Sequence, residues 1–410
     1  MKAAWMRAVA RRATPWRVIG LAFLLAGGYA TVLRFTRGLG GATNLSDTFP
    51  WGLWVGFDIL CGVGLAAGGF TVSALVYVLR LDRYRALARP AVLTAFIGYL
   101  LVVGGLMFDL GHPWRIWHPM VMWNPHSVMF EIAWCVTLYT TVLAAEVSAM
   151  VFEKLRMRRC TRVVHALTLP LTVAAVLLSM LHQSSLGSLF LIVPGRLHEL
   201  WYTPLLPLLF FISAVGVGLA MTIMESTLSS RTFRRPVELE LLAPVGRLAS
   251  VVLGFYLILR WADMLRSGSL AALWPLDRAA GFFLLETALV AVPVVLFASE
   301  RVARNGRWLY HTAQTVVLGF IVGRLNVAVT GFEVVSGKTY VPYWTEIAVT
   351  GMLVTVGVAG FYLAARYLPV FERDEDLEDR ERTWRIETQR RAAFALARKA
   401  SVSPAGPRGG

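Results

Sequence analysis

Cysteine is scarce in this chain of 410 residues, with only Cys61, Cys135 and Cys160 present. No two of them form a CxxC pair, and an iron–sulfur cluster or a structural zinc ion needs a larger set of ligands at closer spacing. The simplest interpretation is that these thiols are small apolar packing residues. We therefore expect no iron–sulfur cluster and no metal site in this chain.

Charged residues are also few, at 16% of the chain, whereas 57% of the residues are hydrophobic and the mean hydropathy is +0.60. This composition excludes an ordinary soluble domain. The net charge of +15 does not indicate a nucleic-acid partner, because that would need a basic folded domain. The basic residues are instead expected to face lipid and to set the orientation of membrane helices.

Ten apolar runs are each long enough to cross a bilayer as a helix, which takes about 20 residues. They cover residues 17–37, 51–79, 90–110, 127–146, 163–182, 202–227, 241–263, 279–299, 308–330 and 343–365. The sequence thus predicts an all-α integral membrane protein in residues 1–370, because lipid cannot satisfy open backbone polar groups. Residues 371–410 are predicted to form a charged, partly disordered cytoplasmic tail, with a short exposed helix to about residue 399.

The basic residues predict an orientation. Most of the 40 Lys and Arg residues fall at the two ends and in alternate loops, with clusters at 80–89 and 154–162. The positive-inside rule therefore places both termini in the cytoplasm. Arg7, Arg11 and Arg12 before the first run also fit a secretory signal, but the run continues through Val32 without a clear cleavage site, which favours an uncleaved span.

A weak internal repeat relates spans two to five, at 51–182, to spans six to nine, at 202–330. Span four ends in LYTTVLAAE at Glu146 and span eight in VPVVLFASE at Glu300, while His165 and His311 begin the spans that follow. This predicts two four-helix bundles in parallel orientation, flanked by single outer spans. The alternative is that acidic residues and histidines at helix ends coincide by chance.

The histidine pattern does not favour a haem-bearing cytochrome b, which needs facing histidines on neighbouring helices. His165 and His311 lie at predicted inner ends of spans, and the other histidines lie at or beyond outer ends. No span carries two histidines about four turns apart. A single haem between His126 and His182 remains the alternative.

Charged and polar residues within the spans are the candidates for function, because each central charge costs at least about 2.5–3.5 kcal/mol on insertion scales. The predicted outer half holds Asp58, Asp109, His112, His126, Glu131, His182, Arg260, Asp263, Arg324, Asn326 and Glu346. The middle and inner half hold Glu146, Glu225, Glu286 and Glu300. These sets predict a polar outer pocket and a carboxylate path. Internal salt bridges, such as Arg260 with Asp263, or side chains that snorkel to an interface are the alternatives.

Three long strings carry a resemblance to a known family. They are GFDILCGVGLAAGGF at 56–70, FDLGHPWRIWHPMVMWNPHSVMFE at 108–131 and LHQSSLGSLFLIVP at 181–194. They closely resemble the HybB branch of the NrfD and polysulfide-reductase membrane-subunit family, and the likeness covers nearly all ten spans. The resemblance implies a duplicated four-helix-bundle fold and a quinone-reactive subunit without haem, despite the traditional label of cytochrome b subunit.

The resemblance also implies partners and a location. A periplasmic ferredoxin-like iron–sulfur subunit and the small and large subunits of a nickel–iron hydrogenase would exchange electrons with menaquinone or ubiquinone, in the bacterial inner (cytoplasmic) membrane. Two alternatives stay open. The chain could be the quinone subunit of another respiratory oxidoreductase, or a secondary transporter, for which an inverted repeat with broken helices would be typical.

The resulting hypothesis is reversible two-electron, two-proton exchange with quinone in the outer pocket. Carboxylates and imidazoles suit a carbonyl that becomes a hydroxyl. The candidates for binding the quinone are Asp58, Asp109, His112, His126, Trp51, Trp54, Trp114 and Arg324. Glu131 is the candidate that passes protons inward and Glu225 its counterpart near the cytoplasm, with Glu146 and Glu286 as further carboxylates of the path. The resemblance covers the motifs with Asp58, His112, His126, Glu131 and Glu225, and the other assignments depend on the predicted topology.

Overall fold

The computed structural model describes residues 14–47, 49–192 and 195–371, and all regular structure within them is helical. Ten segments are long and apolar enough to span a membrane, which confirms the predicted fold class. Eight of these spans are continuous helices: α2 (Pro15–Arg37), α5 (Arg85–Asp109), α7 (Val128–Lys154), α8 (Arg158–Leu189), α9 (Leu206–Phe233), α10 (Leu239–Ser267), α11 (Arg278–Ala298) and α15 (Trp344–Tyr367). The N-terminal arginines and the tail from residue 372 lie outside the described residues.

Two spans are composite. The second span contains η1 (Trp54–Cys61), α3 (Gly62–Leu65), α4 (Gly68–Ser73) and η2 (Ala74–Val78), and the ninth contains α13 (Gly306–Leu325), η6 (Asn326–Thr330) and α14 (Gly331–Ser336). The segments η1, η2 and η6 are π-helical, and η1 contacts η6. Asp58 and Asn326 therefore both lie in π-helical turns, a geometry that recurs at functional sites.

Several helices extend past the apolar runs that predicted them. The fourth span continues to Lys154 and the fifth to Leu189. Backbone hydrogen bonds continue into the interfacial region, so a helix does not end where its apolar sequence ends. Because α8 extends in this way, His182 lies inside the helix and is fully buried, whereas the sequence placed it at an outer end.

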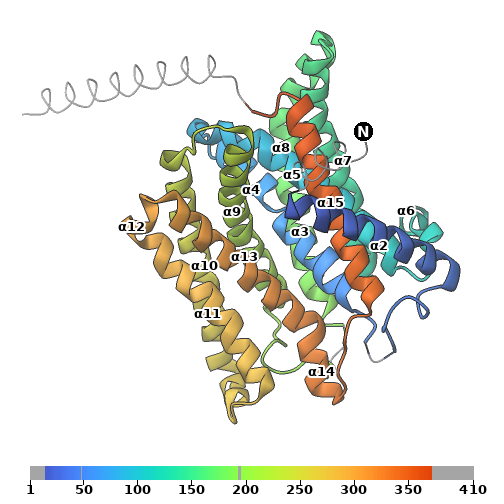
Figure 1. Ribbon diagram of the computed structural model, residues 1–410. Helices are drawn as coiled ribbons and strands as arrows, with labels where there is room; N and C mark the ends of the chain where they lie inside the picture. Colours follow the sequence, from blue (N-terminus) through green and yellow to red (C-terminus); the bar gives the residue numbers. More distant parts are fainter. Residues whose placement is uncertain (1–13, 48, 193–194, 372–410) are drawn as a thin grey trace, which may run out of the picture.

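The spans form two groups with the same cyclic order of contacts (Figure 1). In the first bundle, the second span contacts α5, α5 contacts α7, α7 contacts α8, and α8 contacts the second span again. In the second bundle the order is α9, α10, α11 and α13, with α13 packed against α9. This arrangement fits the predicted pair of four-helix bundles. Their origin as a repeat and the boundaries of the two halves stay predictions.

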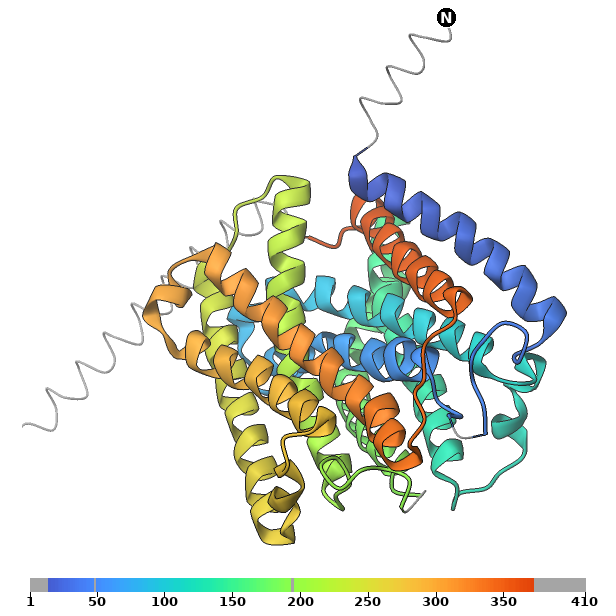
Figure 2. The same cartoon turned by 60° about the horizontal axis from the view of Figure 1, so that its bottom comes forward.

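At two contacts between helices the backbones approach each other closely. The flanking helices α2 and α15 lie side by side (Figure 2), and a Cβ on Gly27 would stand 2.4 Å from the Cβ of Met352. Between the bundles, α4 meets α9 where a Cβ on Gly218 would lie 2.7 Å from the carbonyl carbon of Ala67. Small residues at such positions are typical of helix packing in membranes, because they let two backbones approach.

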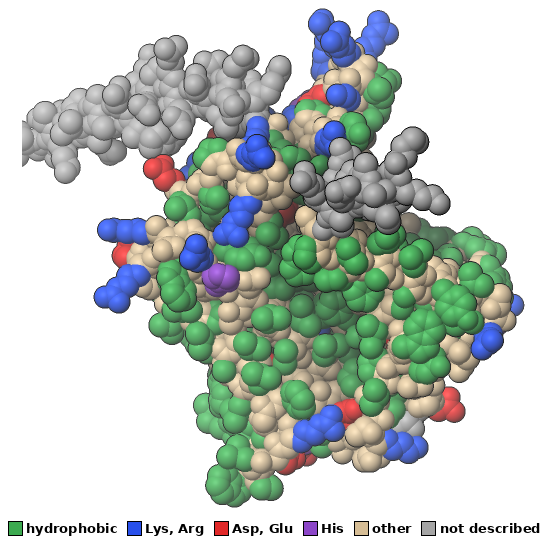
Figure 3. All heavy atoms as spheres, viewed as in Figure 1, with side chains coloured by type: hydrophobic (Ala, Val, Ile, Leu, Met, Phe, Trp, Pro, Cys, Tyr) green, Lys and Arg blue, Asp and Glu red, His purple; other side chains and the backbone are tan. Residues whose placement is uncertain are grey.

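The surface suits a bilayer. Figure 3 shows hydrophobic side chains over the middle of one face, with Lys and Arg around its edges, many of them at the top and left and others at the bottom and right. Many large apolar side chains on the spans are exposed, among them Leu25, Val251 and Ile258. These side chains would contact lipid tails, so the ten helices form a multi-pass integral membrane protein. The side of the membrane on which each terminus lies stays a prediction.

Candidate functional site

Two predicted carboxylates interact electrostatically where η1 packs against α5. Asp58 is 8% exposed, its Oδ2 accepts a hydrogen bond of 2.8 Å from the Thr350 hydroxyl, and it interacts electrostatically with Asp109. The Oδ1 atom of Asp109 is buried and has no hydrogen-bond partner among the described residues. A buried carboxylate oxygen without a partner is a natural contact point for a ligand or an ordered water. We call Asp58, Asp109, Arg34 and Glu346 the acidic site.

Arg34 brings the positive charge of the acidic site, and the sequence analysis missed it. It lies near the end of α2, which the predicted topology places on the outer side, and it is only 3% exposed. Its Nε donates to the carbonyl oxygen of Phe108 at 2.7 Å and its Nη2 to that of Leu110 at 2.6 Å. Those carbonyls end α5 and have no partner inside the helix. Arg34 therefore caps α5 and also interacts with Asp109.

Glu346 closes the acidic site from α15. Its Oε1 accepts hydrogen bonds from the backbone N–H groups of Asn44 at 2.9 Å and Tyr343 at 3.1 Å, and its Oε2 accepts one from the Tyr340 hydroxyl. Burial raises the pKa of the Tyr340 hydroxyl, and the adjacent carboxylate raises it further. Tyr340 therefore remains protonated. The Trp54 indole donates to the backbone carbonyl oxygen of Glu346 at 3.2 Å and is 1% exposed, which makes it a wall of the site.

The predicted aromatic and histidine contacts lie mostly outside the acidic site. His112, Trp114 and His126 are exposed on the connection between α5 and α7, which contains η4 (Pro113–Arg115) and α6 (His118–Val121). Trp51 packs against Phe190 and Phe332, with ring centroids 5.1 Å and 5.7 Å away. The connection therefore presents an exposed aromatic surface next to a buried polar site.

The four carboxylates of the predicted path lie in separate places. Glu131 and Glu146 are on α7, Glu225 is on α9 and Glu286 is on α11, and no interaction found among the described residues joins any two of them. Glu131 is half-buried near the start of α7, and Glu146 accepts a hydrogen bond of 3.3 Å from Thr172. A path between them therefore needs other polar groups or water.

Polar side chains of the kind that a proton path needs lie in the core of the first bundle. The Tyr99 hydroxyl and His182 Nδ1 are 2.9 Å apart, and the Tyr99 and Tyr139 rings meet edge to face with centroids 4.5 Å apart. Tyr139 interacts electrostatically with Glu146. His182 Nε2 and the Gln183 amide are buried without partners in the described residues, whereas the buried Ser179 hydroxyl interacts with Tyr99 and Tyr139. His182 was the one member of this cluster among the candidates from the sequence, because those candidates were mainly charged residues and histidines within the spans.

Glu225 lies beside a cavity of about 50 Å³ between the start of α5 and the end of α9. Ser226, Ser229 and Ser230 also line it, and Glu225 Oε1 has no hydrogen-bond partner among the described residues. A polar cavity of this size holds water. Because the basic cluster at 80–89 adjoins the start of α5, the cavity lies toward the predicted cytoplasmic side.

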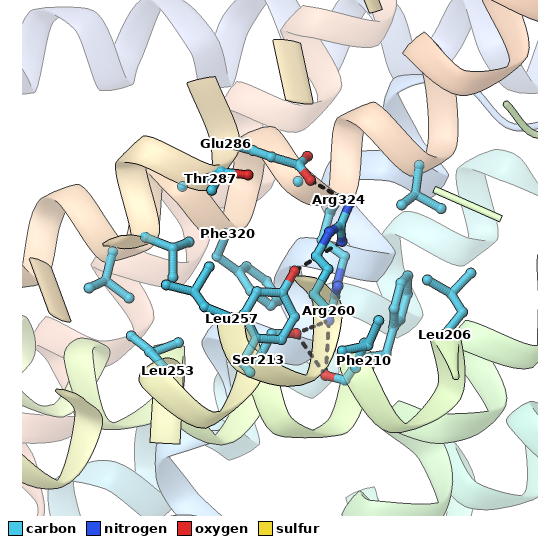
Figure 4. A pocket seen from close by; sticks show the side chains of 17 residues that line it. Leu206, Phe210, Ser213, Leu253, Leu257, Arg260, Glu286, Thr287, Phe320 and Arg324 are labelled. Atoms are coloured by element: carbon cyan, nitrogen blue, oxygen red, sulfur yellow. Dashed lines mark hydrogen bonds and ion pairs between the residues drawn. The ribbon is translucent and has the colours of Figure 1, made fainter. Parts of the chain in front are cut away.

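The second bundle contains a separate polar cluster (Figure 4). Arg260 Nη2 and Glu286 Oε1 form a buried ion pair at 2.7 Å, so Arg260 pairs with Glu286 and not with Asp263. Glu286 also accepts hydrogen bonds from Asn326 at 2.6 Å and from the Trp201 indole at 3.2 Å. Three donors on three chain segments thus fix this carboxylate.

Arg324, predicted to bind quinone, belongs to this second cluster. Its Nη2 donates to the carbonyl oxygen of Phe210 and to the Ser213 hydroxyl, each at 3.0 Å, and its guanidinium lies 3.5 Å from the centroid of the Phe210 ring. No interaction found among the described residues joins Arg324 to the acidic site. The polar outer pocket expected from the sequence is therefore divided into two sites.

Histidines, cysteines and carboxylates are the side chains that bind a metal ion, and histidine pairs bind haem, so their positions in the described part of the chain matter. No three His, Cys, Asp or Glu side chains there converge on one point. Of the seven histidines, all within the described residues, only His182 is buried, and its Nδ1 bonds to Tyr99. The chain thus offers no facing pair of buried imidazoles for a haem.

Family models identify the class of protein. Residues 41–336 match the family model described as "Polysulphide reductase, NrfD". This match covers most of the ten-span region, and the chain therefore belongs to the NrfD family. The family relationship expected from the three sequence strings is confirmed.

Individual relatives extend over nearly the whole chain. A Nitratidesulfovibrio vulgaris protein, named without an activity, is 39% identical over 89% of this chain and 97% of its own length. The probable Ni/Fe-hydrogenase 2 b-type cytochrome subunit of Escherichia coli is 30% identical over 83% of this chain and 88% of its own. The menaquinone reductase integral membrane subunit of N. vulgaris is 28% identical over 88% and 93%, respectively.

Proposed function

We propose that this chain is the quinone-reactive membrane subunit of a respiratory nickel–iron hydrogenase complex. It passes electrons reversibly between a ferredoxin-like iron–sulfur subunit on the periplasmic side and menaquinone or ubiquinone. The acidic site carries this proposal, because two buried aspartates, Asp58 and Asp109, interact electrostatically there and Asp109 also interacts with Arg34. The names of the E. coli and N. vulgaris relatives support hydrogenase and quinone chemistry, respectively.

The acidic site has the groups that quinone reduction needs. Each quinone takes up two electrons and two protons, so its two carbonyl oxygens become hydroxyls. Asp58 and Asp109 supply protons as general acids and recover them in the reverse direction. Arg34 stabilises the negative charge that develops on an oxygen as electrons arrive. Tyr340, which keeps its proton, orders Glu346 beside them.

Electrons enter from outside this chain, and the connection between α5 and α7 is the proposed docking surface. Trp114, Trp117 and Trp123 are 66%, 52% and 67% exposed there. Exposed aromatic side chains of this kind are typical of protein interfaces. His112 and His126 lie on the same connection, so we assign them to the contact with the iron–sulfur subunit and to the approach to the acidic site.

Protons move through the first bundle in this proposal. Glu131 receives them near the predicted outer side, and Tyr139, Tyr99 and His182 with ordered water relay them toward Glu146. Glu225 and its serine-lined cavity give access to the cytoplasm. We place Glu286 outside this path, since its ion pair with Arg260 holds it in the second bundle.

The test uses the complete complex in membrane vesicles, with hydrogen-dependent quinone reduction and charge movement measured together. Asp58→Asn is expected to lower quinone reduction at least about tenfold while the complex still assembles. Glu131→Gln is expected to reduce charge movement per quinone reduced. Glu240→Gln, on the exposed first turn of α10, is the matched control and should leave both unchanged.

Either variant can contradict its part of the proposal. Normal quinone reduction in Asp58→Asn, with an unchanged KM, would remove the acidic site from the reaction. A Glu131→Gln chain with normal quinone reduction and normal charge movement would remove the proton path. These outcomes are independent, because a quinone site can operate with protons taken from one side only.

Affinity purification in a mild detergent, followed by mass spectrometry, tests the partner. Nickel–iron hydrogenase subunits together with a ferredoxin-like protein are the expected result. A molybdenum enzyme or a cytochrome as partner would keep the quinone chemistry but replace hydrogen as the electron donor. Reproducible isolation of the chain alone would favour the transporter alternative, which none of the compared relatives supports by name.

A further inference from the structure

The cluster in the second bundle has unequal charges. Arg260 and Arg324 bring two guanidinium groups to the cavity, and Glu286, which pairs with Arg260, is the one carboxylate among the residues that line it. Asp263 acts electrostatically on Arg260 from outside this lining, and Glu286 also acts on Arg324 without forming an ion pair with it. Arg324 is 5% exposed and forms no ion pair with any carboxylate in the described residues. A buried charge without a counter-charge is strongly unfavourable, above all in a membrane helix.

Several hydrogen-bond donors in this cluster also lack acceptors. Arg324 donates from Nη2, whereas its buried Nε has no acceptor among the described residues. The same holds for Arg260 Nε. Tyr256 accepts a bond from Arg260 Nη1 at 3.1 Å, and its own hydroxyl hydrogen has no acceptor in the part described. Buried donors normally have partners, so these point to a missing acceptor.

These donors line one cavity. Arg260, Arg324 and Tyr256 border a space of about 30 Å³ inside the second bundle, and Figure 4 shows both arginine side chains among those that line it. The rest of the lining is mainly apolar, including Leu253, Val290 and Phe320. Such a space holds one or two small species but not a quinone ring, since ligand pockets of that kind are roughly ten times larger.

We propose that the second bundle binds a single small monovalent anion, with chloride as the representative species, between Arg260, Arg324 and Tyr256. The anion accepts the hydrogen bonds that the protein leaves open and balances the second guanidinium charge. Water alone would satisfy the donors but not the charge. Phe210, whose ring lies under Arg324, stabilises the cation without neutralising it. This inference is independent of the proposed quinone chemistry.

The first test measures thermal unfolding of the full chain in detergent at constant ionic strength, while sodium gluconate is replaced by sodium chloride or bromide. A saturable rise of the unfolding midpoint with chloride, reproduced by bromide, is expected. Crystals grown in bromide should then show anomalous density between Arg260 and Arg324. An identical midpoint in all three salts, with no bromide density, would overturn the proposal and leave water in the cavity.

Two variants give opposite expectations. Arg324→Gln removes the unbalanced charge and should abolish the dependence on chloride. Glu286→Gln leaves two unbalanced guanidinium groups and should shift saturation to at least about tenfold lower chloride, in line with the strong effect of local charge on ion binding. Arg304→Gln, on an exposed side chain, is the control. Equal chloride dependence in all variants would contradict an anion site between these arginines. If Arg324→Gln does not fold, the chloride dependence of Glu286→Gln alone tests the proposal.

Discussion

Arg34 connects a flanking helix to the acidic site through one side chain. Its two hydrogen bonds reach the last turn of α5, which also carries Asp109. Arg34→Gln is expected to lower the free energy of unfolding by about 1.5–3 kcal/mol, because bonds from a charged donor to buried carbonyls are lost. Thermal or denaturant unfolding in detergent measures this change.

The matched control is Arg37→Gln, one turn further along α2, where the side chain is exposed. It should change stability by less than about 0.5 kcal/mol. Equal losses in the two variants would mean that positive charge near the membrane surface matters, and not the cap on α5.

Single residues also show what could be predicted from the sequence. Asp58 and Asp109 were expected together because both lie at the same predicted depth, and the structure brings them into electrostatic contact. Arg34 and Tyr340 were missed, since their roles depend on contacts with residues distant in the chain. Arg324 was expected in one pocket with Asp58 and Asp109 but contacts residues of the second bundle, because a predicted depth does not say which bundle a side chain faces.

At the scale of elements, the contact between α4 and α9 controls how closely the bundles pack. A Cβ on Gly218 would lie 2.7 Å from backbone atoms of Ala67 and Gly68, so the helices must separate to admit it. Gly218→Ala is expected to destabilise the chain by about 1–3 kcal/mol, as overpacking does elsewhere. Unfolding in detergent checks the value.

Gly281→Ala is the control for backbone propensity. Gly281 lies in the second turn of α11, and an added Cβ there meets no atom within 4 Å. Alanine is favoured over glycine in a helix by up to about 1 kcal/mol, so this variant should be neutral or stabilising. Destabilisation of similar size in both variants would contradict the close-packing argument.

The helices themselves were predictable and their details were not. Apolar runs identified all ten spans, because the need to satisfy the backbone in lipid leaves a helix as the structure for each. The ends of α7 and α8 differ from the apolar limits because the hydrogen-bond ladder continues into polar sequence. The π-helical turns of η1 and η6 have no composition that distinguishes them from an α-helix.

For the whole molecule, orientation is the main prediction to test. Cys160 lies near the start of α8 and is partly exposed, whereas Cys61 and Cys135 are buried. A membrane-impermeant thiol reagent should therefore label Cys160 in inverted vesicles and not in intact cells. An added cysteine in Asn124→Cys, on the exposed connection before α7, should react from the outside of intact cells.

The reverse labelling pattern would invert the topology and move the acidic site to the cytoplasmic side. Label on Cys61 or Cys135 in the native protein would instead show that the bundles had opened, and that preparation would be rejected. The two buried native cysteines, Cys61 and Cys135, therefore serve as an internal control for the labelling experiment.

The π-helical turns have a consequence for comparing sequences within this family. A π turn holds an additional residue relative to an α turn, so a chain shorter by one residue in η1 could still form a continuous helix. Because the deletion turns the π turn into an α turn, the flanking helix would keep roughly its orientation, but residues inside the segment would face a direction that differs by up to about 100°. An aspartate in such a relative could align with Asp58 in sequence and yet face away from α5 in the fold. Relatives should therefore be checked for gaps in this segment before an aspartate there is taken as equivalent.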